Sequence, residues 1–156
     1  MDNFLVSVHN ILRWVILLML IISIMKSLSG WMGRKSFTNG DRKTFLLTLI
    51  PTHLNLVIGL YQLLAGKYGI FNTKLPEGVS LMKDKFFRFY WVEHPTGMIL
   101  AIILITLGYG VAKKPLADQT KFKRAFWFFF VALIIILATI PWPSREIVGR
   151  PIFPGV

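Results

Sequence analysis

Four long apolar runs constrain this chain more than any other feature of its sequence. They cover about residues 4–25, 44–65, 89–111 and 125–140. Crossing a hydrocarbon core of roughly 30 Å takes about 20 helical residues, and only helices and closed barrels satisfy their backbone hydrogen bonds in lipid. The sequence therefore predicts an all-α integral membrane protein. We expect one transmembrane domain over residues 1–156, folded as a four-helix up-down-up-down bundle.

The charged residues flank these apolar runs and do not form a separate soluble domain. Eighteen Lys and Arg oppose seven Asp and Glu, which gives a net charge of +11, while 54% of the residues are hydrophobic. We therefore expect the basic residues to meet the anionic headgroups of the lipid bilayer, and not nucleic acid. The chain has no cysteine, which excludes disulfides, iron–sulfur clusters and covalently attached haem.

The distribution of Lys and Arg predicts the orientation of the chain. Ten of them lie in the stretches 26–43 and 113–124, and seven lie in the stretches 67–88 and 145–150 on the opposite side. Because basic loops stay on the cytoplasmic side, we expect both termini outside. The first run lacks a basic start and a small-residue cleavage site, so it is expected to be a span and not a cleaved signal peptide.

Polar residues inside the first two runs recur at helical spacing. One face of the first run carries His9, Arg13, Ile16, Leu20, Ser23 and Ser27. One stripe of the second run carries Thr48, Thr52, Asn55, Gly59 and Gln62. Small and polar stripes of this kind pack helices together in lipid. Both faces are therefore expected to contact neighbouring helices.

The stretches between the runs predict connections of different kinds. Glycines and charges from Lys26 to Lys43 predict a loop, with Thr38-x-x-Asp41 as the start of the next helix. A second loop is expected over residues 66–88, and a basic connection over 113–124. The aromatic cluster at 126–130 is expected to face lipid. Prolines after Ile140 predict an extended tail that is ordered by its contacts.

His9 and His94 are the candidate metal ligands. Each lies about five residues, on the order of 8 Å, inside the same membrane face, and their two runs are parallel. Ionisable residues within a span are functional candidates by default, and two imidazoles at matched depth suit a b-type haem. We therefore predict one haem b with both histidines as axial ligands. The alternative is that both form hydrogen bonds with neighbouring helices or water.

Residues near this pair complete the predicted haem site. Gly97 and Ala101 share a face with His94 and leave space for the porphyrin. Arg13, Arg88 and Arg145 are expected on the same membrane side, where they are candidate partners for the haem propionates.

Two further ionisable residues have more than one interpretation. Glu93 is expected to pair with Arg88 or a tail arginine, and the alternative is that it carries protons for a quinone. His53 lies off the polar stripe of its run, so we interpret it as a helix-contact histidine, with ligation in place of His9 as the alternative. No hydrolase triad, phosphate-binding loop, carboxylate pair or zinc motif is present. We assign no catalytic residue, and the sequence leaves open whether the protein is an enzyme.

The chain resembles the small four-span bacterial membrane proteins named cytochrome B or cytochrome b-like. The resemblance extends over most of the chain and is carried by Phe4-x4-His9-Asn10-x2-Arg13-Trp14, Ser29-Gly30-Trp31, Asp41-Arg42-Lys43, Met82-Lys83-Asp84-Lys85, Glu93-His94, Ile140-Pro141-Trp142-Pro143 and Arg150-Pro151. It implies haem b, electron transport and the bacterial inner membrane. His53 is not part of the pattern. A looser similarity links the chain to copper-resistance membrane proteins and to a small membrane protoporphyrinogen oxidase, but the oxidase needs a lysine within a span, and the predicted spans have none.

The function expected from these features is one-electron transfer by a membrane-bound b-type cytochrome. Its partners would be a quinol pool or a partner protein on one side and another redox centre on the other. The first alternative is a cofactor-free accessory subunit that packs against a larger membrane complex through its polar stripe and tail, or that forms a homo-oligomer. The second alternative is an oxidase of haem biosynthesis.

Overall fold

The computed structural model describes residues 2–153, and these residues form helices and connections without any strand. The elements are α1 (Asp2–Met32), α2 (Asn39–Ala65), α3 (Lys85–Arg88), the single π-helical turn η1 (Phe89–Glu93), α4 (His94–Ala112) and α5 (Asp118–Thr139). The short α3 and η1 run into α4 and make one continuous helical stretch from Lys85 to Ala112. Four helices are thus long and apolar enough to cross a membrane, as the sequence predicted.

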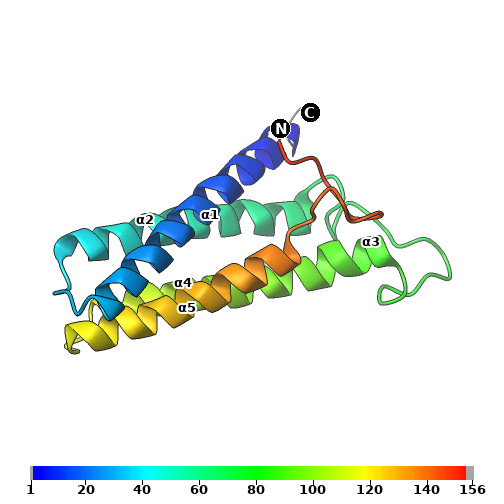
Figure 1. The fold of residues 1–156 in the computed structure, drawn as a ribbon. Coiled ribbons are helices and arrows are strands. Elements are labelled where there is room, and N and C mark those ends of the chain that lie inside the picture. The colour runs from blue at the N-terminus through cyan, green and yellow to red at the C-terminus, as the bar shows by residue number, and fades with distance from the viewer. Residues whose placement is uncertain (1, 154–156) are drawn as a thin grey trace.

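The four long helices alternate in direction and form a bundle (Figure 1). α1 packs against α2 and α5, and α4 packs against the same two helices. α1 and α4 therefore lie on a diagonal of the bundle and run in the same direction. The start of α1, the start of α4 and the tail after α5 lie at one end, and the connections α1–α2 and α4–α5 lie at the other (Figure 1).

Large side chains fill the centre of the bundle, and apolar side chains also cover its outside. Phe45 of α2 and Phe129 of α5 are fully enclosed, with ring centroids 4.9 Å apart. Phe129 also packs onto Gly108 of α4, where an added Cβ would lie 2.6 Å from its ring. Leu54 and Leu100 are among many exposed apolar side chains on the outer faces. An apolar exterior of this extent matches a hydrocarbon environment.

The polar faces of the first two runs lie inside the bundle, as predicted. Arg13, Ser23 and Ser27 of α1 are buried, and so are Thr48 and Thr52 of α2. The Ser23 and Thr48 hydroxyls form a hydrogen bond of 2.8 Å between the two helices. The small polar groups thus join α1 to α2.

The predicted loop from Lys26 to Lys43 is wrong at both ends. α1 continues to Met32 because Gly30, which suggested a loop, is where Phe122 of α5 packs against the helix; an added Cβ would lie 2.5 Å from that ring. α2 already begins at Asn39, one residue after the N-cap Thr38. Thr38 and Asp41 form a reciprocal capping box, which confirms the predicted helix start.

The basic connection before the fourth span is also shorter than predicted. α5 begins at Asp118, so Lys121, Lys123 and Arg124 belong to its first turns. The aromatic cluster at 126–130 is divided between two environments: Phe129 is in the core, whereas Trp127 is exposed. Its expected position towards lipid is therefore wrong for Phe129. Helical periodicity separates the two side chains, because residues two positions apart point about 200° apart.

The tail after α5 contains no helix within the described residues, as predicted, but residues 143–148 form turns, so the expected extended conformation is wrong there. It turns back across the end of the bundle towards the start of α1 (Figure 1). The Arg13 guanidinium donates a hydrogen bond of 2.7 Å to the carbonyl oxygen of Ile152. Trp14 stacks on Phe153 with a centroid distance of 5.6 Å. These contacts hold the tail over the end at which His9 and His94 lie.

Candidate functional site

His94 is positioned by the π-helical turn that precedes it. Its backbone N–H donates to the carbonyl oxygen of Phe89, five residues earlier. Pro95 follows at the start of α4 and has no N–H to donate, so the ordinary helical hydrogen bond is missing there. The wider turn accommodates this loss, and turns of this kind occur often at functional sites.

The His94 imidazole is oriented by the end of α5. Its Nδ1 lies 2.9 Å from the carbonyl oxygen of Thr139. A carbonyl oxygen can only accept, so Nδ1 carries the proton and donates it, which leaves a lone pair on Nε2. Histidines that bind metals typically hold their second nitrogen in this way.

His9 reaches from α1 towards the polar stripe of α2. It packs on Gly59, where an added Cβ would lie 3.3 Å from its Cε1 atom. Its Nδ1 is buried without a hydrogen-bond partner. Asn55 Oδ1 and Gln62 Nε2, one turn before and after Gly59, are also buried without partners. Buried polar atoms without partners are uncommon and indicate a ligand, a water or a functional role.

The structure brings His9 and His94 together across the diagonal of the bundle. Their ring centroids are 6.4 Å apart, and the ring planes are inclined by 61°. An imidazole nitrogen binds a metal ion at about 2 Å, so two imidazoles on one ion have centroids about 6 Å apart. The observed separation therefore suits two imidazoles that share one metal ion.

The space beside Gly97 and Ala101, predicted for a porphyrin, is filled by protein in this structure. The methyl group of Thr139 occupies the position that a Gly97 side chain would take. Ala101 is fully enclosed in the core. The small residues of α4 thus allow close packing of α5, and the same Thr139 that orients His94 covers Gly97.

The three arginines predicted as propionate partners all lie at the histidine end, where each has a partner within the chain. Arg13 donates to the Ile152 carbonyl oxygen. Arg88 forms an ion pair of 2.7 Å with Glu93, one of the two partners expected for that carboxylate. Arg145 donates to the Ala138 carbonyl oxygen and lies over the Phe89 ring. The histidine end therefore carries a net positive charge from these arginines, because only Arg88 of the three is paired with a carboxylate.

His53 lies apart from this pair in its contacts. Its Nδ1 is 3.0 Å from the Leu49 carbonyl oxygen of its own helix, and its Nε2 is 3.5 Å from the Thr106 hydroxyl of α4. These contacts are those of a histidine between two helices. Over residues 2–153, no group of three or more His, Cys, Asp or Glu gathers around a common point, so the two imidazoles stand as a pair.

Three residues that surround the pair were not assigned to it from sequence. Thr139 contacts His94 through its backbone carbonyl, which every residue has, so the identity of residue 139 could not predict this contact. Asn55 and Gly59 did carry one, because they lie on the polar stripe of α2, but the stripe alone does not distinguish helix packing from a site.

Comparison with protein-family models, with curated proteins and with solved structures finds no match to this chain. The side chains at the histidine end are therefore the basis on which a function can be proposed.

Proposed function

We propose that this chain is a membrane-bound b-type cytochrome-like protein in which His9 and His94 hold the iron of one haem b. The pairing of the two imidazoles, 6.4 Å apart across the bundle, carries the proposal. The donor set fits haem iron: two neutral imidazoles come from different helices, and a carbonyl fixes the tautomer of one of them. Bound haem would supply one-electron chemistry.

The chain's own residues would orient the cofactor and place charge around it. Thr139 directs His94 Nε2 away from α5, and Gly59 leaves room for the His9 ring. Arg13 and Arg145 already donate to backbone carbonyls, and their remaining N–H groups would serve the propionates. The Thr139 methyl group must leave Gly97 for a macrocycle to lie over that residue, and Thr139 is the last residue of α5.

The proposed work is electron transfer between a quinol pool or a partner protein and a second redox centre. We place the protein in the bacterial inner membrane, as the resemblance implies, with both termini outside, because residues 26–43 and 113–124 carry ten Lys and Arg whereas residues 67–88 and 145–150 on the opposite side carry seven. The histidine pair would then lie near the outer face.

The accessory-subunit alternative assigned the polar stripe and the tail to a partner protein. In the structure both elements have partners within the chain: Thr48 bonds to Ser23, Gly59 contacts His9, and the tail binds Arg13. These contacts within the chain count against the accessory-subunit alternative.

The test is the absorption spectrum of the full chain, purified after expression with ample haem supply. We expect a red protein with a Soret band and a reduced α-band of the b type. His9→Ala and His94→Ala should each abolish the bis-histidine spectrum, and added imidazole should restore it partly, since it can occupy the vacated ligand position. His53→Ala is the matched control and should retain the spectrum. A colourless wild-type protein, or loss of haem from His53→Ala alone, would overturn the assignment.

A further inference from the structure

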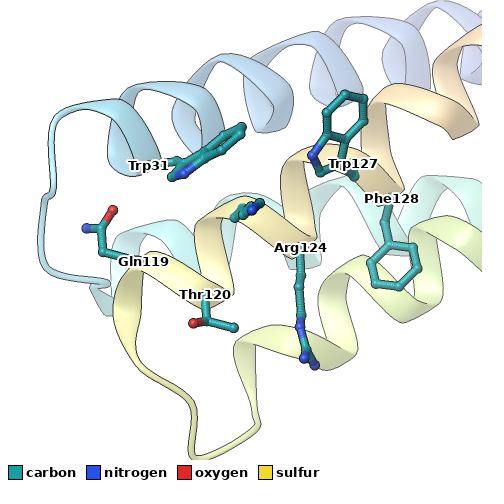
Figure 2. A pocket seen from close by; sticks show the side chains of 7 residues that line it. Trp31, Gln119, Thr120, Arg124, Trp127 and Phe128 are labelled. Atoms are coloured by element: carbon teal, nitrogen blue, oxygen red, sulfur yellow. The ribbon is translucent and has the colours of Figure 1, made fainter.

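A groove opens at the end of the bundle opposite to the histidine pair. Trp31 of α1 and Trp127 of α5 lie on one side of it, and Arg124 and Phe128 of α5 extend towards α4 on the other (Figure 2); Lys123 also lines it. Its volume is about 490 Å³, which lies within the roughly 300–1,000 Å³ of small-molecule sites. Lys123 and Arg124 are exposed, and Phe122 and Phe129 anchor the inner face of the same helix. The groove therefore lies on the outside of a helix that is fixed in the core.

The charge of this groove is positive and unopposed. No carboxylate lines it, and within residues 2–153 the ion pairs are Lys26–Asp41 and Arg88–Glu93, neither of which includes Lys123 or Arg124. The Lys123 ammonium lies 5.5 Å from the centre of the Trp31 ring, a cation–π arrangement that holds the charge at the mouth of the groove. An anionic group is the complement of this arrangement.

Gln119 and Thr120 also line the groove near its basic residues, and beyond Trp127 the exposed surface of α5 is apolar towards the middle of the bundle. Trp127 is 48% exposed, and Val131 and Ile134 extend the exposed apolar row along α5 at helical spacing. Tryptophans at a helix end mark the interface between headgroups and hydrocarbon. A ligand for this groove thus has a negative head at the level of Lys123 and an apolar chain along α5.

We propose that this α1–α5 groove is a binding site for an anionic phospholipid, with the headgroup phosphate at Lys123 and Arg124 and an acyl chain along Trp127, Val131 and Ile134. Basic pockets between membrane helices, on the side with more Lys and Arg, bind such headgroups. The inference requires that the four helices span a membrane. Lipid binding at this groove does not depend on haem. The lipid titration can therefore fail while the absorption spectrum shows haem, and the reverse can also occur.

Native mass spectrometry of the full chain in a mild non-ionic detergent tests the proposal. Phosphatidylglycerol is titrated against phosphatidylcholine, which has the same chains and no net charge. We expect phosphatidylglycerol to bind more tightly, and the Lys123→Gln/Arg124→Gln double variant to weaken its binding by about 25-fold, since each basic residue near a lipid surface contributes about fivefold. Arg42→Gln/Lys43→Gln removes two exposed charges at the same end, outside the groove, and should leave the affinity unchanged.

Three results separate this site from its alternatives. Equal weakening by both double variants would show a general charge effect and overturn the proposal. Full competition by glycerol phosphate, which has the head without the chains, would also overturn it, because a lipid site needs both. Trp127→Ala should weaken phosphatidylglycerol binding and leave glycerol phosphate binding unchanged. All of these side chains are exposed, so the variants should fold, which circular dichroism verifies.

Discussion

The two halves of the α1–α2 interface differ in whether their buried polar atoms have hydrogen-bond partners. Towards the α1–α2 connection, Ser23 bonds to Thr48, Thr48 also donates to the Met19 carbonyl oxygen, and Lys26 pairs with Asp41 at 3.2 Å. Towards the other end, the same two helices leave His9 Nδ1, Asn55 Oδ1 and Gln62 Nε2 buried without partners. Within residues 2–153, the half near the α1–α2 connection has one exception, the Ser27 hydroxyl, which is buried without a partner.

This difference suggests that the polar groups of one half stabilise the interface and that those of the other half have a different role. A buried polar group without a partner costs roughly 1–3 kcal/mol, and the first half shows that these helices can satisfy such groups. Proteins break the rules of packing and hydrogen bonding mostly at functional sites. The half that contains His9 is thus built at the expense of stability, and the half that contains Thr48 contributes stability.

The largest effect on stability is expected from Asp41→Ala. Asp41 accepts hydrogen bonds from the backbone and hydroxyl of Thr38 and closes the capping box of α2. Loss of such a cap lowers the free energy of unfolding by about 1–2 kcal/mol. The Lys26 ion pair adds little, because the Lys26 side chain is 40% exposed. Thermal unfolding in detergent, followed by circular dichroism, measures the change.

Asp118→Ala is the matched control for Asp41→Ala. Asp118 also lies in the first turn of a long helix at the same end, but the N-cap position of α5 is Ala117, and no ion pair within residues 2–153 includes Asp118. A decrease in stability equal to that of Asp41→Ala would show that the capping box contributes nothing specific.

A smaller effect is expected from Thr48→Val, which keeps the shape of the side chain and removes the hydroxyl. The buried Ser23 hydroxyl then loses its partner on α2. Hydrogen bonds between membrane helices contribute about 0.6 kcal/mol on average and up to about 1.7 kcal/mol, and we expect a loss of about 1 kcal/mol in the same unfolding assay. Ser7→Ala, which removes a hydroxyl that donates to the Asn3 carbonyl oxygen of its own helix, should change stability by less than about 0.5 kcal/mol. Equal effects of the two variants would contradict the expectation that the Ser23–Thr48 hydrogen bond stabilises the α1–α2 interface.

The smallest effect, with the opposite sign, is expected from Asn55→Leu. Its Oδ1 is buried without a partner, so an apolar side chain of similar size removes an unsatisfied group. We expect the haem-free protein to gain about 0.5 kcal/mol, a part of the full cost of such a group because Asn55 is only half-buried. The proportion of haem-loaded protein should fall in the same variant. A loss of stability like that of Thr48→Val would mean that both halves are structural.

The sequence was sufficient for the number of long apolar helices and for the expectation that His9 and His94 lie at one level of the bundle. Apolar runs set the number of spans, and the depth of His9 and His94, counted in residues from the membrane face, placed them at one level. Helix ends were less predictable: Gly30 suggests a loop until Phe122 is known to pack against it. The partners of Arg13 and Arg145 are backbone carbonyls, which no sequence pattern distinguishes.

The sequence by itself determined which side chains exist at each level of the four apolar helices, because length, hydropathy and helical periodicity are properties of one segment at a time. It thereby determined the polar face of α1, the stripe of α2 and the matched level of the two histidines. Only the tertiary structure decided that the Thr139 carbonyl orients His94, that the Thr139 methyl covers Gly97, and that Trp31 faces Lys123. Those contacts join different helices, and the rotation of each helix about its axis is fixed only when all four pack together.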